Sequence, residues 1–314
     1  MTGLLPDRVR HVLTRRSLWG YLPQRTPAVP AGPPMLALTF DLDYQADTDA
    51  LPALQTLVEK HGAAMTVYAI GRLVENDPGP YRAAAEAGHE LANHTWSHPN
   101  NPVLNPDREF WDLGVDDMAD EIGRCQDALE RHTGRRPTSF RTPHFKDAPR
   151  MLDAVARFPE LDCISTTLAS KCPVPTPYFP TSREPAGRES LHFVRRADET
   201  TPRPPIMVPL TPCPGLRWSP FCSYSAIRRP ANPAQGAGLL NVAEFERRWG
   251  VMLDRAQPRK FASTYFDPLD VMRDDETRTA FDRMLGEATR RGWVLTTTTA
   301  VAKRWRGVAA GGDA

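Results

Sequence analysis

The amino-acid sequence predicts an α/β fold built on a parallel sheet or a barrel. Between residues 35 and 167, short apolar segments alternate with amphipathic ones, as strands and crossover helices do in parallel sheets. The same alternation resumes between about residues 242 and 298. The chain of 314 residues shows no internal repeat and is long enough for one large domain.

The strands predicted in the first half of the chain are short apolar runs bounded by turn residues. They are the segments 35–40, 63–70, 89–94, 138–143 and 161–166. The helices predicted between them carry apolar residues at helical spacing. They are the segments 47–61 with Asp47 or Thr48 as N-cap, 79–88 closed by Gly88, 114–134 closed by Gly134, and 148–158.

The second half of the chain is less regular. From about residue 168 to residue 236 prolines and arginines are dense, which predicts a long loop insertion with one strand at the apolar segment "IMVPL". Strand and helix patterns then return in the segments 242–256 (helix), 260–266 (strand), 275–292 (helix) and 293–298 (strand). We therefore expect a proline-rich N-terminal arm over residues 1–34, one domain over 35–306 and a disordered tail over 307–314.

Charge and cysteine content exclude several classes of protein. The formal net charge is +1 and the isoelectric point about 7.7, which gives no reason to expect a nucleic-acid partner. No apolar run is long enough to span a membrane. The N-terminal residues interleave Arg and His with Leu, Val and Trp, so they form either a helix packed on the domain or a contact with a membrane surface. The cysteine count is odd, with no CxxC pair and no export signal, so we expect a cytoplasmic location.

Polar side chains follow several of the predicted strands. Asp41 and Asp43 come after the first, His94 and His98 after the third, Arg141 and His144 after the fourth, and Asp267 after the late strand "KFASTYF". Functional groups of parallel α/β folds gather at the carboxyl ends of the strands. The sequence therefore predicts one site that combines these side chains.

The residue types of this site are typical of a catalytic metal. A spacing of four places His94 and His98 on one side of a helical turn, and two histidines with one carboxylate leave metal positions open for water and substrate. Strand residues at i and i+2 point the same way, so one of Asp41 and Asp43 can bind the metal while the other acts as a base. Helix capping explains one of these acids but not both. Arg141 either holds the buried base or forms a surface salt bridge.

Three segments resemble the motifs of the polysaccharide deacetylase family, also called the NodB-homology family. They are "TFDLD", "GHELANHTWSHP" and "TGRRPTSFRTP", and the similarity covers roughly residues 35–300. The middle segment is the most specific, because its glycine, acid, asparagine and both histidines match. The resemblance implies a distorted (β/α) barrel, TIM-barrel-like with about seven parallel strands. It also implies a divalent metal, often zinc, used to hydrolyse N-acetyl or related amides of amino sugars.

The resemblance also implies a role for each residue. Asp41 would be the general base and Arg141 its partner. His144 would supply a backbone N–H to the oxyanion, at a position where the family usually has tyrosine. The metal ligands would be Asp43, His94 and His98. Zinc comes first among the candidate metals, and cobalt, manganese and iron also suit this ligand set.

The late strand departs from the family pattern. Related sequences have a histidine there that protonates the leaving amine, whereas this chain has Asp267 followed by Pro268, and no histidine follows His192. Either Asp267 is the acid, with a pKa raised by burial or by Asp41, or His144 has taken over the role, or catalysis is lost and the pocket kept. As a purely structural alternative, Asp267 opens an Asp-Pro turn.

The predicted function is that of a metal-dependent hydrolase removing an N-acetyl or N-formyl group from an amino sugar or glycoconjugate precursor. Trp218 and Phe221 are candidates for stacking on the sugar ring, although core packing accounts for them equally well. The alternatives are an allantoinase-like hydrolase of a cyclic amide and a non-catalytic glycan-binding protein derived from a deacetylase. A Rossmann-type nucleotide site is disfavoured because no glycine-rich loop follows the first strand.

Overall fold

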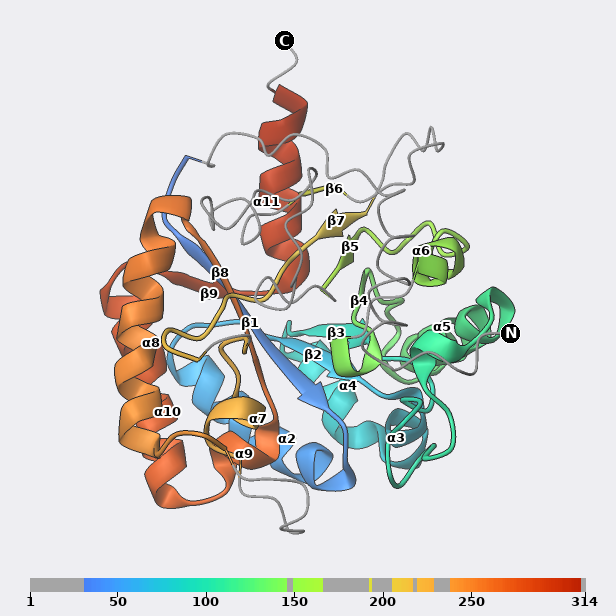
Figure 1. The fold of residues 1–314 in the computed structure, drawn as a ribbon, viewed down its shortest axis with the longest axis horizontal. Helices are drawn as coiled ribbons and strands as arrows, with labels where there is room; N and C mark the ends of the chain where they lie inside the picture. The colour runs from blue at the N-terminus through green and yellow to red at the C-terminus, as the bar shows by residue number, and fades with distance from the viewer. Residues whose placement is uncertain are drawn as a thin grey trace, which may run out of the picture.

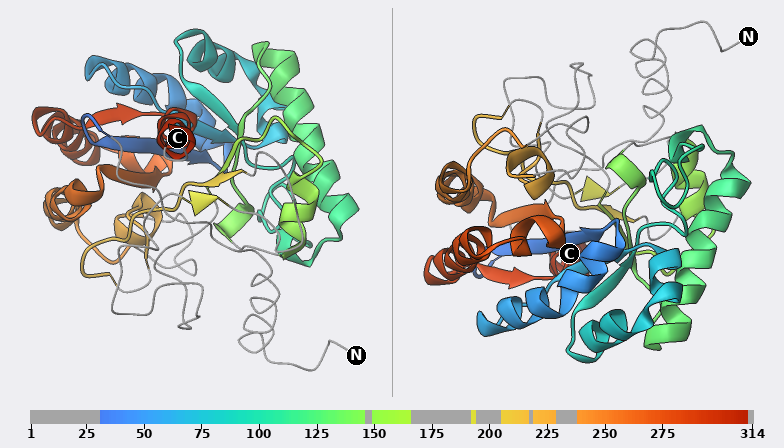
Figure 2. Two further views of the ribbon diagram at one scale, coloured as in Figure 1. Left: turned by 90° about the horizontal axis from the view of Figure 1, so that it is seen from above. Right: turned by 90° about the horizontal axis from the view of Figure 1, so that it is seen from below.

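The computed structural model describes residues 31–145, 149–165, 192–193, 205–216, 219–228 and 238–311. Its strands form one curled sheet, with the first strand next to the end of the strand order and helices around the outside (Figures 1 and 2). The strands are β1 (Met35–Leu42), β2 (Thr66–Ala69), β3 (Glu90–Asn93), β4 (Ser139–Phe140), β5 (Cys163–Ile164), β6 (His192–Phe193), β7 (Ile206–Met207), β8 (Phe261–Phe266) and β9 (Val294–Thr296).

Seven of the strands form a continuous parallel series in the order β7-β5-β4-β3-β2-β1-β8. Strand β6 pairs antiparallel with β7, and β9 pairs with the first residues of β1. The prediction of a distorted (β/α) barrel with about seven parallel strands is therefore confirmed, as a curled half-barrel.

The segment after β7 covers the outer edge of β8. The backbone N–H of Thr211 donates to the carbonyl of Ser263 at 2.8 Å, and that of Tyr265 donates to the carbonyl of Phe221 at 3.2 Å. Cys222 and Tyr265 form an isolated parallel bridge. Irregular backbone thus occupies the place where a further strand would close the barrel.

The helices pack outside the sheet (Figure 2). They are α2 (Gln45–Lys60), α3 (Gly71–Asn76), α4 (Pro78–Glu86), α5 (Val115–Thr133), α6 (Pro149–Val155), α7 (Ser223–Ala226), α8 (Val242–Ala256), α9 (Pro268–Met272), α10 (Asp275–Arg290) and α11 (Thr298–Gly311). None of these described helices combines the length and the apolar character needed to cross a membrane.

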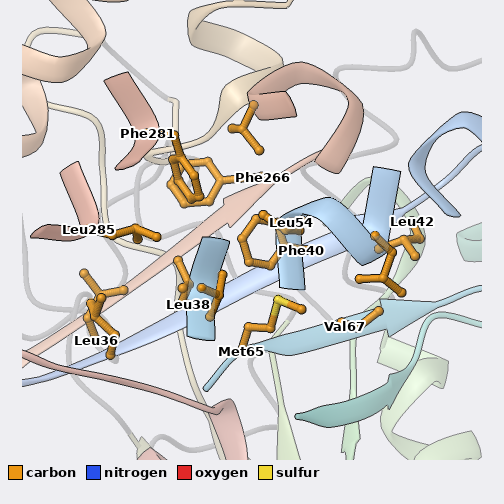
Figure 3. Packing of buried hydrophobic residues seen from close by; sticks show 14 of the residues in the cluster. Leu36, Leu38, Phe40, Leu42, Leu54, Met65, Val67, Phe266, Phe281 and Leu285 are labelled. Atoms are coloured by element: carbon orange, nitrogen blue, oxygen red, sulfur yellow. The ribbon is translucent and has the colours of Figure 1, made fainter. Parts of the chain in front are cut away.

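Strand β1 separates the core from the site by its two-residue period. Leu36, Leu38 and Phe40 point toward the covering helices, where the Phe40 ring lies 5.8 Å from that of Phe266 (Figure 3). Thr39 and Asp41 alternate with these residues and so face the inside of the half-barrel, where both are buried. The core-facing residues therefore fix the direction of the polar ones.

Most predicted elements are confirmed, and two predicted ends are wrong. Helix α2 begins at Gln45 with Tyr44 as N-cap, because the carboxylate of Asp47 accepts from the backbone N–H of Tyr44 at 3.1 Å from inside the first turn. The tail predicted as disordered is helical through Gly311, since its first residues include two alanines, which favour a continued helix. Residues 312–314, like the predicted arm up to residue 30 and most of the predicted insertion, lie outside the described residues.

Candidate metal centre and catalytic cavity

The polar residues that follow the strands meet in one cavity of about 780 Å³ at the carboxyl end of the sheet. Its lining includes Asp41, Asp43, His94, His98, His144 and Asp267. Arg141 lies directly beneath it, with no exposed surface. The structure therefore brings together every residue that the sequence predicted for catalysis and metal binding.

Asp43, His94 and His98 form a compact cluster of potential metal ligands. The Oδ1 atom of Asp43 lies 3.5 Å from Nε2 of His94 and 3.6 Å from Nε2 of His98. The three ligand atoms lie within 4.8 Å of one another. The same Oδ1 atom is buried and makes no hydrogen bond to any described residue, which is costly unless a further group satisfies it. The donor set fits a divalent cation with positions left open.

Hydrogen bonding fixes which nitrogen of His94 faces the cluster. Its Nδ1 atom lies 2.9 Å from the carbonyl oxygen of Arg141, which can only accept. The proton therefore sits on Nδ1, and the lone pair of Nε2 points toward Asp43. This is the tautomer that a metal ligand requires.

The protonation of the cluster also suits metal binding. Burial lowers the pKa of His98 to about 3, so its imidazole is neutral. Burial acts to raise the pKa of Asp43, but His98 and His94 outweigh it and hold that pKa below its ordinary value. A carboxylate and neutral imidazoles are the forms that bind metal ions. For His94, burial acts to lower the pKa but Asp41 and Asp43 outweigh it and raise that pKa, so metal binding there would displace a proton.

The two histidines converge through a loop, so the predicted helical turn is wrong. Thr95 and His98 have positive φ angles, 71° and 50°. The Oδ1 atom of Asn93 accepts from the backbone N–H of Thr95 at 2.8 Å, and the hydroxyl of Thr95 accepts from the N–H of His98 at 3.0 Å. The carboxylate of Glu121 holds Ser97 through two hydrogen bonds of 2.8 Å. These bonds bring the imidazole centroids to 4.9 Å despite the irregular backbone.

Asp41 forms a buried ion pair with Arg141, as predicted. The guanidinium donates from Nη1 to Oδ1 of Asp41, from Nη2 to the hydroxyls of Thr39 and Ser165 at 2.9 Å each, and from Nε to the carbonyl of Ser165 at 3.0 Å. The ring of Tyr68 lies against it at 3.9 Å. A surface salt bridge is excluded, because Arg141 has no exposed surface and Asp41 only 2%. The other carboxylate oxygen of Asp41 is 3.9 Å from Nε2 of His94 and so borders the metal cluster.

The chain is similar to known proteins over part of its length. Residues 28–159 match the family model described as polysaccharide deacetylase. Over these residues the chain is similar to the polysaccharide deacetylase family. It is 24% identical over 126 residues to the peptidoglycan-N-acetylglucosamine deacetylase PgdA of Listeria monocytogenes, a match that covers 40% of this chain and 25% of that protein.

Two further family members extend the comparison. Chitin deacetylase 3 of Cryptococcus neoformans is 29% identical over 130 residues, which is 41% of this chain and 29% of that protein. The crystal structure of a putative polysaccharide deacetylase from Mycobacterium smegmatis superposes with a TM-score of 0.71 at 15% identity, covering 91% of this chain and 95% of that one. The chain thus spans between a quarter and a third of the length of these two curated deacetylases, while sharing the fold of the solved structure over nearly its whole length.

Asp267 lies at the end of β8, at the position where the resemblance described above leads us to expect a histidine. It ends β8 and precedes α9, and its backbone N–H donates to the hydroxyl of Ser223 at 2.8 Å. Its side chain makes no capping hydrogen bond, and its Oδ1 atom is buried without a hydrogen-bond partner among the described residues. Burial, followed by the charges of Asp270 and Asp47, raises the pKa of Asp267 well above its ordinary value. These effects favour the protonated form of the carboxyl group.

His144, the other candidate acid, lies beside His98. Its side chain is exposed, and its ring centroid is 4.9 Å from that of His98. Its φ of 54° places the backbone in the left-handed region, which marks a strained turn after β4. The structure thus puts both candidates on the cavity wall, in very different surroundings.

The residues predicted to contact a sugar ring are not supported. Phe221 has no exposed surface and stacks on Phe245, with centroids 4.9 Å apart and planes at 20°, so the core-packing alternative holds for it. Trp218 lies outside the described residues. Sequence reasoning missed Asp47, which lines the cavity and whose pKa burial raises to about 8. The only signal for Asp47 in the sequence was its position at the predicted start of a helix. Helix capping already explained the presence of an acid there.

Proposed function

We propose that this protein is a metal-dependent hydrolase that removes an N-acetyl or N-formyl group from an amino sugar or glycoconjugate precursor. The observation that carries the proposal is the Asp43–His94–His98 cluster beside the buried Asp41–Arg141 pair in one cavity. The named activities of the related peptidoglycan and chitin deacetylases support it.

A divalent metal, with zinc as the first candidate, would polarise the amide carbonyl and make water a better nucleophile at neutral pH. Asp41 takes the proton from the attacking water, and Arg141 holds its carboxylate in one orientation. Asp267 gives a proton to the leaving nitrogen, because it lines the same cavity and its raised pKa favours the protonated carboxyl group. His144 is the second candidate for that proton.

A binding protein without catalysis is the competing proposal. It has no use for Asp41, whose carboxylate is buried next to the ligand cluster and held by a dedicated arginine. Burying the two charges costs desolvation free energy. In a protein that only binds glycans, the pair would bring no compensating gain in affinity. The retention of this pair therefore favours the enzyme.

The deciding experiment combines metal analysis with a fluorescamine assay for amine release on the same purified sample. The panel contains acetylated and formylated amino sugars, free and nucleotide-linked, together with allantoin followed by its own hydrolysis product. We expect about one metal per chain, and loss of amine release in Asp41→Asn with the metal retained. Absence of metal even after addition of zinc or cobalt would refute the proposal, as would full activity of the Asp41→Asn protein.

We propose a cytoplasmic location, supported by the described cysteines Cys125, Cys163, Cys213 and Cys222, which are free and buried. Fractionation of expressing cells tests it, and recovery of the protein outside the cytoplasm would contradict it. Contact of the N-terminal arm with a membrane surface is a separate proposal, tested by co-sedimentation of the full chain with anionic vesicles.

A further inference from the structure

Exposed apolar side chains gather at the mouth of the cavity. Large hydrophobic residues that remain exposed in the described part of the chain are Val103, Tyr224, Leu239, Leu269 and Val294. Val103, Tyr224 and Leu269 line the cavity, with exposed fractions of 73%, 47% and 44%. Single exposed hydrophobic residues are common on protein surfaces, but here three of the five line the same cavity. We call these three residues the apolar rim.

The Val103 part of the rim is tied to the metal cluster. Val103 lies in the loop that follows His98, and its backbone N–H donates to Oδ1 of Asn101 at 2.9 Å. The amide nitrogen of Asn101, which is 1% exposed, donates to the backbone carbonyl of Asp43 at 2.8 Å. One buried side chain therefore fixes the distance between this exposed valine and a metal ligand.

The other two rim residues are held by neighbouring short helices. Tyr224 belongs to α7, and the guanidinium of Arg228 lies 4.2 Å from its ring centroid. Leu269 belongs to α9, and its backbone N–H donates to Oδ1 of Asp47 at 3.0 Å. Helices α7 and α9 lie side by side (Figure 1). The rim is thus built in advance, which reduces the entropic cost of covering it.

The chemistry of the rim points away from a purely carbohydrate ligand. Sugar hydroxyls need polar partners, and sugar rings stack on aromatic faces, whereas Val103 and Leu269 offer neither. One face of the Tyr224 ring is already occupied by Arg228. Exposed aliphatic side chains lower the free energy of ligand binding only when an apolar group of the ligand covers them and removes them from water. Such a group must lie within reach of an amide bound at the cavity floor.

We propose that the amino sugar reaches this enzyme on an alkyl chain, which leaves the cavity across Val103, Tyr224 and Leu269. The inference rests on the proposed function, because the rim surrounds the same cavity, and it names the class of substrate. The alkyl chain makes the apolar contact with the rim, while the amide of the sugar occupies the space above Asp43.

The test measures kcat/KM for methyl, butyl and octyl glycosides of N-acetylglucosamine, with octyl glycoside kept below its micelle concentration. Each methylene that the rim covers should raise kcat/KM about threefold to fourfold, the equivalent of a buried CH₂. In Val103→Ser/Leu269→Ser the octyl-to-methyl ratio should fall at least tenfold. Leu239→Ser is the matched control, because Leu239 is aliphatic, 70% exposed and outside the cavity lining, and it should keep the wild-type ratio.

A binding measurement separates failure of this inference from failure of the proposed function. Calorimetric titration of the zinc-loaded full chain with the same glycosides needs no turnover. Tighter binding of the octyl than of the methyl glycoside, lost in the rim variant, supports the inference even if no amine is released. Equal binding of all three glycosides overturns it. Binding to phosphatidylcholine vesicles without any sugar, lost in the same variant, also overturns it, because the rim would then contact a lipid surface and not a substrate chain.

Discussion

The Asp41–Arg141 pair offers the sharpest test of how the site is built. Both groups are buried, and Arg141 makes further hydrogen bonds to Thr39 and Ser165. Removing one partner leaves the other charge buried without compensation, at a cost of about 3–5 kcal/mol. For a domain of this size each kcal/mol lowers Tm by about 2–4 °C, so Asp41→Asn and Arg141→Met should each lose about 10 °C.

The double variant distinguishes a charge pair from two independent residues. Asp41→Asn/Arg141→Met removes both charges, so it should be little worse than either single change, with a coupling energy above about 2 kcal/mol. Urea unfolding followed by circular dichroism gives the four free energies, with chelator present so that metal loss does not contribute. Additive effects within about 0.5 kcal/mol would refute the reasoning.

An exposed pair serves as the control for this cycle. Arg108 and Asp117 lie 2.8 Å apart, with side chains 48% and 57% exposed. Their cycle should give only about 0.2–1 kcal/mol, because solvent screens both charges. Amine release should be lost in every variant that lacks Asp41, whatever its stability.

Further predictions concern the metal, the acid and the fold. His94→Ala should purify without metal, as measured by elemental analysis, because it removes one of three ligands. If Asp267 is the acid, activity should fall as pH rises through its raised pKa, and Asp267→Asn should lose about 10²–10⁴-fold in kcat together with that alkaline limb. If Asp267→Asn leaves activity unchanged while His144→Gln lowers it, the donor of the proton to the leaving nitrogen is His144 and not Asp267. Gly134→Ala should cost about 1 kcal/mol in urea unfolding, because Gly134 ends α5 at a φ of 72°. Gly114→Ala, at a φ of −68° and with open space around it, should not show this loss.

Local periodicity made most elements predictable. Helix α8 has the predicted bounds, Val242–Ala256, and α5 ends at the predicted Gly134. Both signals, the apolar spacing and the glycine C-cap, depend only on residues that are close together in the sequence. The start of α2 was wrong for a local reason. Asp47 has the residue type of an N-cap, but it lies inside the first turn, where its carboxylate accepts from the backbone N–H of Tyr44, so the helix begins earlier.

The site was predictable in its residue types but not in its local geometry. Strand ends and the two-residue period placed Asp41, Asp43 and Arg141 together. The loop that carries His94 and His98 was taken for a helical turn, since a spacing of four is equally compatible with both. Its course depends on Glu121 in α5, and no pattern within the loop reveals that partner. The cavity rim likewise arises only when separate segments meet.

The three aspartates near the cavity floor show why one residue type can serve opposite roles. Asp43 faces two imidazoles, which keep it ionised as a ligand. Burial also raises the pKa of Asp41, but its guanidinium partner opposes that effect and orients the carboxylate that would accept a proton in the proposed reaction. Asp267 faces other carboxyl groups, and both burial and these neighbours favour its protonated form. The two buried carboxyl groups thus differ in their neighbours, and in the proposed reaction this difference would let one take a proton from water and the other return one to the leaving nitrogen. The missing histidine therefore does not by itself argue against catalysis.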